Sequence, residues 1–423
     1  MKIRKQILFI WLFLPAQIVL SQEPVTLEQC QQWAREYHPL IGQKELYQKM
    51  SELKLENNAT NYLPQVDFKA QATYQSDVTK VGISLPNINI PEQSKDQYKM
   101  YLDVKQNIWD GGLTKANEIL EKAKEGASLQ GVEVEVYKVK EQVNNLFFSS
   151  FLIQQNLELL SKKQETLDAR KNRMDSAVRN GVLLSSELDQ ILAELVKVHQ
   201  QKIELQSQRE TVLSALAILT GKQLTDLQNV EIENQDIAFA NDLKRPELTL
   251  FEKQTTQLEA SSKLLQKKRN PKLFGFGQAG YGRPGLNMLS NDFDSYALVG
   301  VGINWTVFDW KTTKRDREVI QLQQQLINTQ EQQFKRNINI ALDGEYRKIK
   351  QLEDILQSDR ELIDLQTRIT ASSASKLENG TITSSDYIQD LNAEMGARIT
   401  FETHKVQLEA VKINYQTING NNN

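Results

Sequence analysis

The chain has 423 residues, of which 51 are basic and 54 acidic, so its formal net charge is −3 at pH 7. This balance argues against a nucleic-acid-binding surface, which needs an excess of positive charge. The single cysteine excludes an internal disulfide and a thiolate metal cluster within one chain, and the three scattered histidines argue against a histidine metal site. The sequence contains no nucleophile–base pair, phosphate-binding loop or metal-ligand spacing, so we expect no enzyme, no cofactor and no metal.

Residues 1–21 have the pattern of a secretory signal peptide, in which basic residues precede the apolar run 7–14. Cleavage is expected near Ser21, and Pro15 argues against the alternative of a membrane anchor. Cys30 lies well beyond the apolar run without small residues before it, so we interpret it as an ordinary cysteine rather than a lipidation site. No later segment reaches the roughly 20 consecutive apolar residues of a spanning helix. We therefore expect an exported chain that is soluble or enters an outer membrane as β-structure.

The first elements of the exported chain are a helix and two strands. A helical pattern covers 25–62 and is interrupted at Pro39. After Pro64 the hydrophobic period changes from 3.6 to 2, which predicts strands over about 65–78 and 97–109. Strands of roughly 10–14 residues with one apolar and one polar face fit a transmembrane β-barrel.

A long helical hairpin is predicted next, over 111–221. Apolar residues recur there every three or four positions with Gln, Lys and Glu between them, which is typical of a coiled coil. The tip is expected at 180–186, because Asn-Gly ends a helix and Ser-Ser-Glu begins one. An unbroken helix of about 70 residues would be a rod of about 100 Å.

The same layout is present twice. The motif around Asp110 returns around Asp309, and the tip around Gly181 returns around Gly380, each 199 residues later. A long repeat with constant internal spacing indicates one structural unit used twice. We therefore divide the chain into a signal peptide (1–21), a first repeat (22–221), a linker (222–242), a second repeat (243–418) and a polar tail (419–423).

In the second repeat we predict strands over about 272–283 and 295–308 and a helical hairpin over 310–418 with its tip at 379–385. The predicted fold is mainly α with a transmembrane β part, in two tandem repeats of helix, β-hairpin and long antiparallel helical hairpin. Four strands cannot close a barrel, and an open edge in lipid leaves backbone groups unsatisfied at several kcal/mol each. The chain is therefore expected to associate with other copies.

These features together make the chain similar to the TolC-type outer-membrane efflux proteins, over nearly the whole exported sequence. The signal peptide, the doubled spacing, the proline-flanked first helices and the turn motifs at 108–115 and 307–314 carry the resemblance. It implies a homotrimer whose 12-stranded β-barrel in the outer membrane continues into an α-helical coiled-coil tunnel across the periplasm. It also implies a passive exit duct of a tripartite efflux or type I secretion system, docked to a periplasmic adaptor (membrane fusion) protein and an inner-membrane pump of RND or ABC type.

The resemblance assigns roles to the helical tips. Acidic residues just beyond the tips line the constriction of related channels, and the matching positions here are Glu187, Asp386 and Asp390. A ring of carboxylates in a narrow pore favours cations; the alternative is that Glu187 and Asp386 only cap helices. Some relatives carry an arginine after the second tip glycine, where this chain has Ile382 and Thr383. The positions that match the adaptor-docking turns are Asn180, Gly181, Val182, Asn379, Gly380 and Thr381.

Three further interpretations complete the sequence analysis. Asp110 and Asp309 are expected to cap the helices that follow them rather than to bind an ion. The competing function is a soluble periplasmic coiled-coil adaptor or scaffold, which would carry one helical hairpin in a compact β-rich domain. The cargo is open among drugs, heavy metals and polypeptides, although the scarcity of His, Met and Cys gives no support to metal coordination along the duct.

Overall fold

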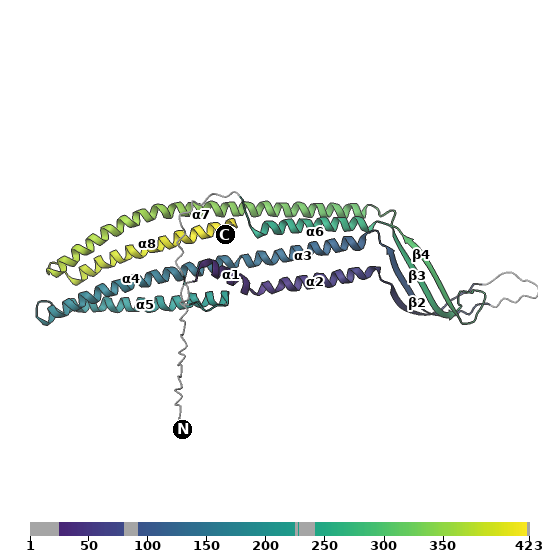
Figure 1. The fold of residues 1–423 in the computed structure, drawn as a ribbon, viewed down its shortest axis with the longest axis horizontal. Helices are drawn as coiled ribbons and strands as arrows, with labels where there is room; N and C mark the ends of the chain where they lie inside the picture. Colours follow the sequence, from purple (N-terminus) through teal and green to yellow (C-terminus); the bar gives the residue numbers. More distant parts are fainter. Residues whose placement is uncertain (1–24, 80–91, 225–226, 228–241, 421–423) are drawn as a thin grey trace, which may run out of the picture.

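The computed structural model describes residues 25–79, 92–224, 227 and 242–420, so the predicted signal peptide and most of the predicted linker lie outside it. The first repeat contains α1 (Leu27–Tyr37), η1 (Pro39–Ile41), α2 (Gly42–Ala59), η2 (Thr60–Tyr62), β1 (Gln65–Tyr74), β2 (Asp96–Trp109), α3 (Leu113–Tyr137), α4 (Val139–Arg179) and α5 (Ser185–Thr220). The second contains α6 (Pro246–Lys268), β3 (Lys272–Arg283), β4 (Asp294–Asn304), α7 (Thr312–Glu378) and α8 (Ser384–Asn419). The molecule is elongated: the helices lie side by side, the sheet stands at one end, and the turns α4–α5 and α7–α8 lie at the other (Figure 1).

The four strands form one antiparallel sheet in the order β1-β2-β3-β4. Directly paired residues share a face, so the register sorts the side chains into two sets. One face is polar, and at its centre Asp103 accepts a hydrogen bond from Gln278 at 3.0 Å and forms an ion pair with Lys69. The opposite face carries apolar side chains such as Leu102 and Val299. Within the described chain, the outer sides of β1 and β4 have no strand beside them.

Two strands are shorter than their sequence pattern predicts. β1 ends at Tyr74, opposite Asp96, rather than at 78. β4 ends at Asn304 rather than at 308, because its partner β3 begins at Lys272, directly after Pro271. Proline has no amide to donate to a sheet, so the alternating pattern continues past Asn304 without a strand to pair with.

The long helices begin and end at equivalent positions in the two repeats. The start of α3, the end of α4 and both ends of α5 lie 199 residues before the corresponding points of α7 and α8. α7 has 67 residues, which at 1.5 Å per residue makes a rod of about 100 Å. Its counterpart is interrupted at Lys138, whose amide bonds to the Glu135 carbonyl at 3.3 Å. No helix within the described ranges is long and apolar enough to cross a membrane.

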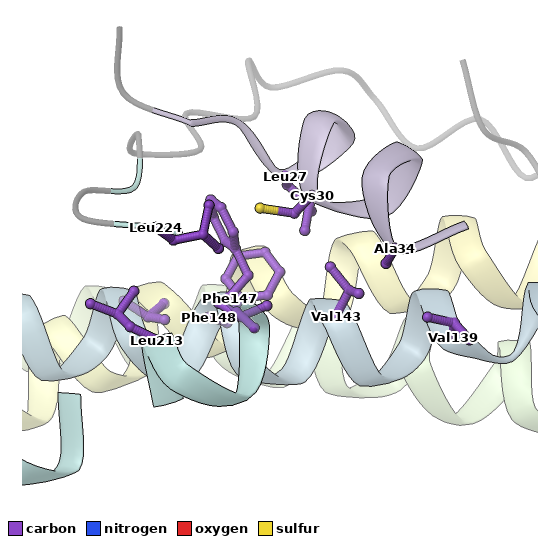
Figure 2. Packing of buried hydrophobic residues seen from close by; sticks show 11 residues of the cluster. Leu27, Cys30, Ala34, Val139, Val143, Phe147, Phe148, Leu213 and Leu224 are labelled. Carbon is purple, nitrogen blue, oxygen red and sulfur yellow. The ribbon is translucent and has the colours of Figure 1, made fainter. Parts of the chain in front are cut away.

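Buried apolar residues form three separate clusters along the helices. The first lies where α1 packs across α4 and α5 (Figure 2), and it consists of Leu27, Cys30, Ala34, Val139, Val143, Phe147, Phe148, Leu213, Leu216, Leu224 and Val406. Burial raises the pKa of the Cys30 thiol to about 11, as is usual for a structural cysteine. The second cluster lies behind the tips, and the third lies between α7 and α8.

The predicted polar tail begins too early, because α8 continues to Asn419. This residue is buried, and its carbonyl accepts a hydrogen bond from the Lys244 amide at 3.0 Å. Gly420 follows with a φ of +82°, and a Cβ added to it would lie 2.5 Å from the carbonyl carbon of Lys244. The end of α8 and the segment before α6 therefore meet backbone to backbone.

Asp110 caps α3 at the junction between the sheet and the helices. Its carboxylate accepts hydrogen bonds from the amides of Gly112, Leu113 and Thr114 at 2.9, 3.2 and 2.5 Å, and from the Tyr62 hydroxyl at 2.7 Å. Burial opposes ionisation, but the hydrogen bonds outweigh it and lower the pKa of Asp110 to about 2. The capping role predicted for this residue is confirmed.

We expect Asp110→Ala to lower the free energy of unfolding at pH 7 by about 1–2 kcal/mol, because a buried helix start loses its acceptor. The pKa of Asp110 is depressed in the folded state, so its contribution is present above about pH 4 and is lost as the pH falls toward 2. Asp309→Ala is the matched control: Asp309 accepts the amides of Lys311 and Thr313 at 3.1 Å but is more exposed. Denaturant unfolding at pH 7 and pH 3 measures both variants, and equal losses would contradict the prediction.

Candidate functional site

Each helical hairpin ends in a tight turn of the same geometry. At the first tip the C-cap of α4 is Asn180, and the amides of Gly181 and Val182 bond back to the carbonyls of Val178 and Ala177 at 3.0 and 2.9 Å. Gly181 has a φ of +68°, a left-handed conformation that glycine adopts without steric cost. This arrangement is a Schellman motif, which satisfies the last carbonyls of the helix.

The second tip repeats the motif. Its C-cap is Asn379, and the amides of Gly380 and Thr381 bond to the carbonyls of Leu377 and Lys376 at 3.0 and 2.9 Å. The φ of Gly380 is +66°. The Thr381 hydroxyl donates a further hydrogen bond to the Lys376 carbonyl at 2.9 Å, which the valine at the equivalent position of the first tip cannot do.

Both tips are open to solvent. No atom of the described residues lies within 4 Å of a Cβ added to Gly181 or Gly380. Val182 and Leu184 are 77% and 73% exposed, so the first tip presents apolar side chains beside open backbone. Such a patch is a feature of contact surfaces. The six residues predicted to dock the adaptor are all exposed, and their docking role stays a prediction: Asn180, Gly181, Val182, Asn379, Gly380 and Thr381.

The helices after the tips begin with different caps. Thr383 is the N-cap of α8. Its hydroxyl accepts a hydrogen bond from the Asp386 amide at 3.2 Å, and the Asp386 carboxylate accepts one from the Thr383 amide at 3.0 Å. This is a complete capping box. The N-cap of α5 is Leu184, whose side chain cannot accept a hydrogen bond. The serines Ser185 and Ser384 are thus the first residues inside their helices, not the caps.

The acids predicted to line the constriction are all hydrogen-bonded within the chain. Glu187 accepts the amide of Ser384 at 2.6 Å, so it caps the helix of the other hairpin. Asp386 caps its own helix, and the hydrogen bond from the side chain of Thr383 lowers the pKa of Asp386. Asp390 accepts a hydrogen bond from the hydroxyl of Ser373. Glu187 and Asp386 therefore act as caps here, and a pore-lining role for the three acids stays a prediction.

Ion pairs that join the two hairpins were not predicted from the sequence. Arg170 and Arg173 on α4 both contact Glu378 at the end of α7, at 2.8 and 2.6 Å. The guanidinium of Arg170 also lies 4.9 Å from the ring centre of Tyr387 on α8. These contacts join the two hairpins, whereas the positions shortly after the second tip glycine hold Ile382 and Thr383 and no arginine. No spacing rule in the sequence singles out charges about 205 residues apart.

A buried polar network lies farther from the tips. Lys163 on α4 donates hydrogen bonds to Glu194 on α5 at 2.7 Å and to Asn392 on α8 at 2.6 Å. The side chains of Lys163 and Glu194 are each only 6% exposed. A buried ion pair that loses one partner leaves an uncompensated charge, so the network penalises any sliding of these three helices past one another.

The part of the chain that the structure describes offers no metal chemistry at the tips or elsewhere. No group of three or more His, Cys, Asp or Glu side chains there could hold an ion. The absence of a catalytic residue, cofactor or metal stays a prediction from the sequence.

Comparison with known proteins gives the following likenesses. Residues 31–222 match the family described as outer membrane efflux protein. The fold is similar to that of the Campylobacter jejuni CmeC outer membrane channel, at 17% identity and a TM-score of 0.62 over 93% of this chain and 85% of that one. It is also similar to CusC (12% identity, TM-score 0.69, 94% and 92% covered) and to the Vibrio cholerae outer membrane protein VceC (12% identity, TM-score 0.62, 92% and 95% covered). No curated protein sequence gives a significant match.

Proposed function

We propose that the chain belongs to the outer membrane efflux protein family, whose model matches residues 31–222, and that it is the exit duct of a multi-component export system. It is an outer-membrane efflux channel that extends into the periplasm, and its family and structural neighbours are channels rather than enzymes. The finer function that we propose is a passive conduit docked to a periplasmic adaptor and served by an inner-membrane RND or ABC-type pump. The soluble-adaptor alternative is not favoured, because it calls for one helical hairpin and the described chain has two.

The observation that carries the proposal is a sheet whose two edges have no partner strand among the described residues, and which continues directly into rods of about 100 Å. An edge strand in lipid needs a neighbouring strand, because the backbone N–H and C=O groups along its open edge would otherwise have no hydrogen-bond partner. Because the strand order alternates in direction, β4 of one copy can pair antiparallel with β1 of the next. Three copies would close 12 strands, which lies within the range known for such barrels, and the helices would continue the wall as a tunnel. A single peak of trimer mass in detergent supports this assembly, and a stable monomer contradicts it.

The helical tips are the part of the molecule that we propose to dock the adaptor and to form the constriction. They lie at the end of the molecule farthest from the sheet (Figure 1), both with exposed glycines and the first also with exposed apolar side chains. An adaptor could therefore contact Gly181 and Gly380 at the same level. Glu187, Asp386 and Asp390 are the side chains that would form an acidic constriction there, and a narrow acidic ring favours cations.

We expect the double variant Glu187→Gln with Asp386→Asn to lower the cation preference of the channel severalfold in planar bilayers. The amides remove the charge but keep a hydrogen-bond acceptor for the backbone amides of Ser384 and Thr383. The change in selectivity therefore reports on charge in the conduction path and not on loss of helix caps.

The alanine double variant is the comparison, because it removes both the charge and the caps. It should lower cation preference as much as the amide variant and also raise conductance, since the first turn of α8 loses two acceptors. If only the alanine variant changes the channel, these acids are helix caps and do not line the pore. Unchanged selectivity in both variants would remove them from the conduction path.

A further inference from the structure

A small cavity of about 260 Å³ lies between residues of the two repeats. Its walls come from α1, from both sides of the α3–α4 interruption, from residues 244 and 246, and from Gly420. Sites for drug-sized ligands have volumes of roughly 300–1,000 Å³. At about 260 Å³, this cavity lies just below that range, so it suits a ligand smaller than a typical drug molecule.

The lining carries an excess of positive charge, in a chain whose net charge is −3. Its cationic residues are Arg35, Lys140 and Lys244, and its single carboxylate belongs to Glu133. This carboxylate is already engaged, because it pairs with Arg35 at 3.0 Å and also with Lys44 from the start of α2. Within the described part of the chain, Glu133 therefore leaves Lys140 and Lys244 without an ion-pair partner.

Lys140 is the clearest case of an uncompensated charge. It is half-buried, and it forms no ion pair with any residue that the structure describes. Its ammonium lies 5.4 Å from the ring centre of Tyr137, and a second cation, Arg245, lies 4.5 Å from the same centre. Burial and the nearby charge of Arg35 lower the pKa of Lys140. The nearby carboxylate of Glu247 is held by Arg245 at 2.5 Å.

We propose that this cavity binds a small oxyanion, a phosphate or a carboxylate group, through Arg35, Lys140 and Lys244. Ammonium and guanidinium groups form short, charge-assisted hydrogen bonds to such oxygens, and these are the stronger hydrogen bonds of proteins. The anion would compensate the charge that Glu133 leaves over.

The position of the site gives the anion a structural consequence. The three donors come from α1, from α4 and from the segment before α6, which are otherwise joined by few polar contacts. A bound anion ties the first repeat to the second at the level where α8 ends. All donors belong to one copy of the chain, so the site requires neither a neighbouring copy nor the proposed export function.

The test is titration of the purified full chain with inorganic phosphate, and separately with acetate, by calorimetry in detergent at constant ionic strength. We expect saturable binding of one anion per chain, and the anion that binds identifies its chemical source. Lys140→Gln should weaken binding by about tenfold or more, the usual effect of losing a charge-assisted hydrogen bond. Lys138→Gln is the control, because Lys138 is two residues away, exposed and paired with Glu135.

Two results would overturn the site: no saturable binding of either anion, or equal weakening by Lys140→Gln and Lys138→Gln. A second variant guards against a folding defect. Lys140→Met removes an uncompensated half-buried charge, so it should raise the thermal midpoint in anion-free buffer and abolish stabilisation by phosphate. A lowered midpoint in anion-free buffer would mean that Lys140 already has a partner, and would contradict the proposal.

Discussion

Val299→Lys is expected to destabilise the assembled protein by about 2–4 kcal/mol, the cost of a lysine on the lipid face of a barrel near the middle of the bilayer. Val299 lies at the centre of β4 and is 89% exposed in the single chain. The register puts it on the apolar face of the sheet, away from Asp103 and Gln278. If that face contacts lipid, no water is available to hydrate the ammonium group of the introduced lysine.

The neighbouring residue provides the control. Leu298 pairs with Gln278, so it lies on the polar face. Leu298→Lys changes an apolar residue to the same charged one, one position away in the same strand, but directs it toward the aqueous side. Denaturant unfolding from lipid vesicles, and the amount of protein in the outer membrane, should show a large loss for Val299→Lys and a small one for Leu298→Lys. Equal losses would mean that the two faces of the sheet are not separated into lipid and water.

Gly420→Ala is expected to cost about 3 kcal/mol or more. A non-glycine residue in the left-handed region costs about 1–2 kcal/mol. At Gly420 a Cβ would also lie 2.5 Å from the carbonyl carbon and 2.7 Å from the carbonyl oxygen of Lys244, which are backbone atoms and cannot rotate away. Relief of this overlap would break the hydrogen bond from the Lys244 amide to buried Asn419, which adds the cost of an unsatisfied group.

Gly181→Ala separates the two contributions. Gly181 has a φ of +68°, close to the +82° of Gly420, but no atom in the described part of the chain lies within 4 Å of its added Cβ. This variant should lose only the cost of a non-glycine residue in the left-handed region, about 1–2 kcal/mol. Thermal and denaturant unfolding compare the two, and hydrogen exchange at the start of α6 should rise only in Gly420→Ala. Equal losses would show that the contact with Lys244 carries no energy.

The sequence predicts well where local chemistry dictates structure. Period-2 alternation sorts Val299 and Leu298 onto opposite faces because successive strand side chains point in opposite directions. Asn-Gly predicts both tips because the left-handed C-cap favours glycine. The constant spacing of 199 residues also relates Gly221, the C-cap of α5, to Gly420, the C-cap of α8, so the repeat itself specifies where α8 ends.

Other features depend on partners that sequence patterns do not specify. The contact of Arg170 with Glu378 joins residues on different helices, and each looks like an ordinary solvated charge in its own helix. The interruption at Lys138 follows β-branched residues that weaken a helix, and two of these residues, Val132 and Val136, are buried by packing that their local sequence does not specify. The cap that Glu187 provides to Ser384 likewise requires the two tips to stand side by side.

The equal bounds of the long helices restrict how this protein can change in length. Seven residues removed from α7 alone would draw the second tip back by about 10 Å while the first stayed in place. The hydrogen bond from Ser384 to Glu187 would then be lost, together with the ion pairs that Arg170 and Arg173 form with Glu378. A viable change in length must therefore occur in both repeats, at positions about 199 residues apart. Natural insertions and deletions in the rods should come in matched pairs, whereas the connections between strands can vary singly.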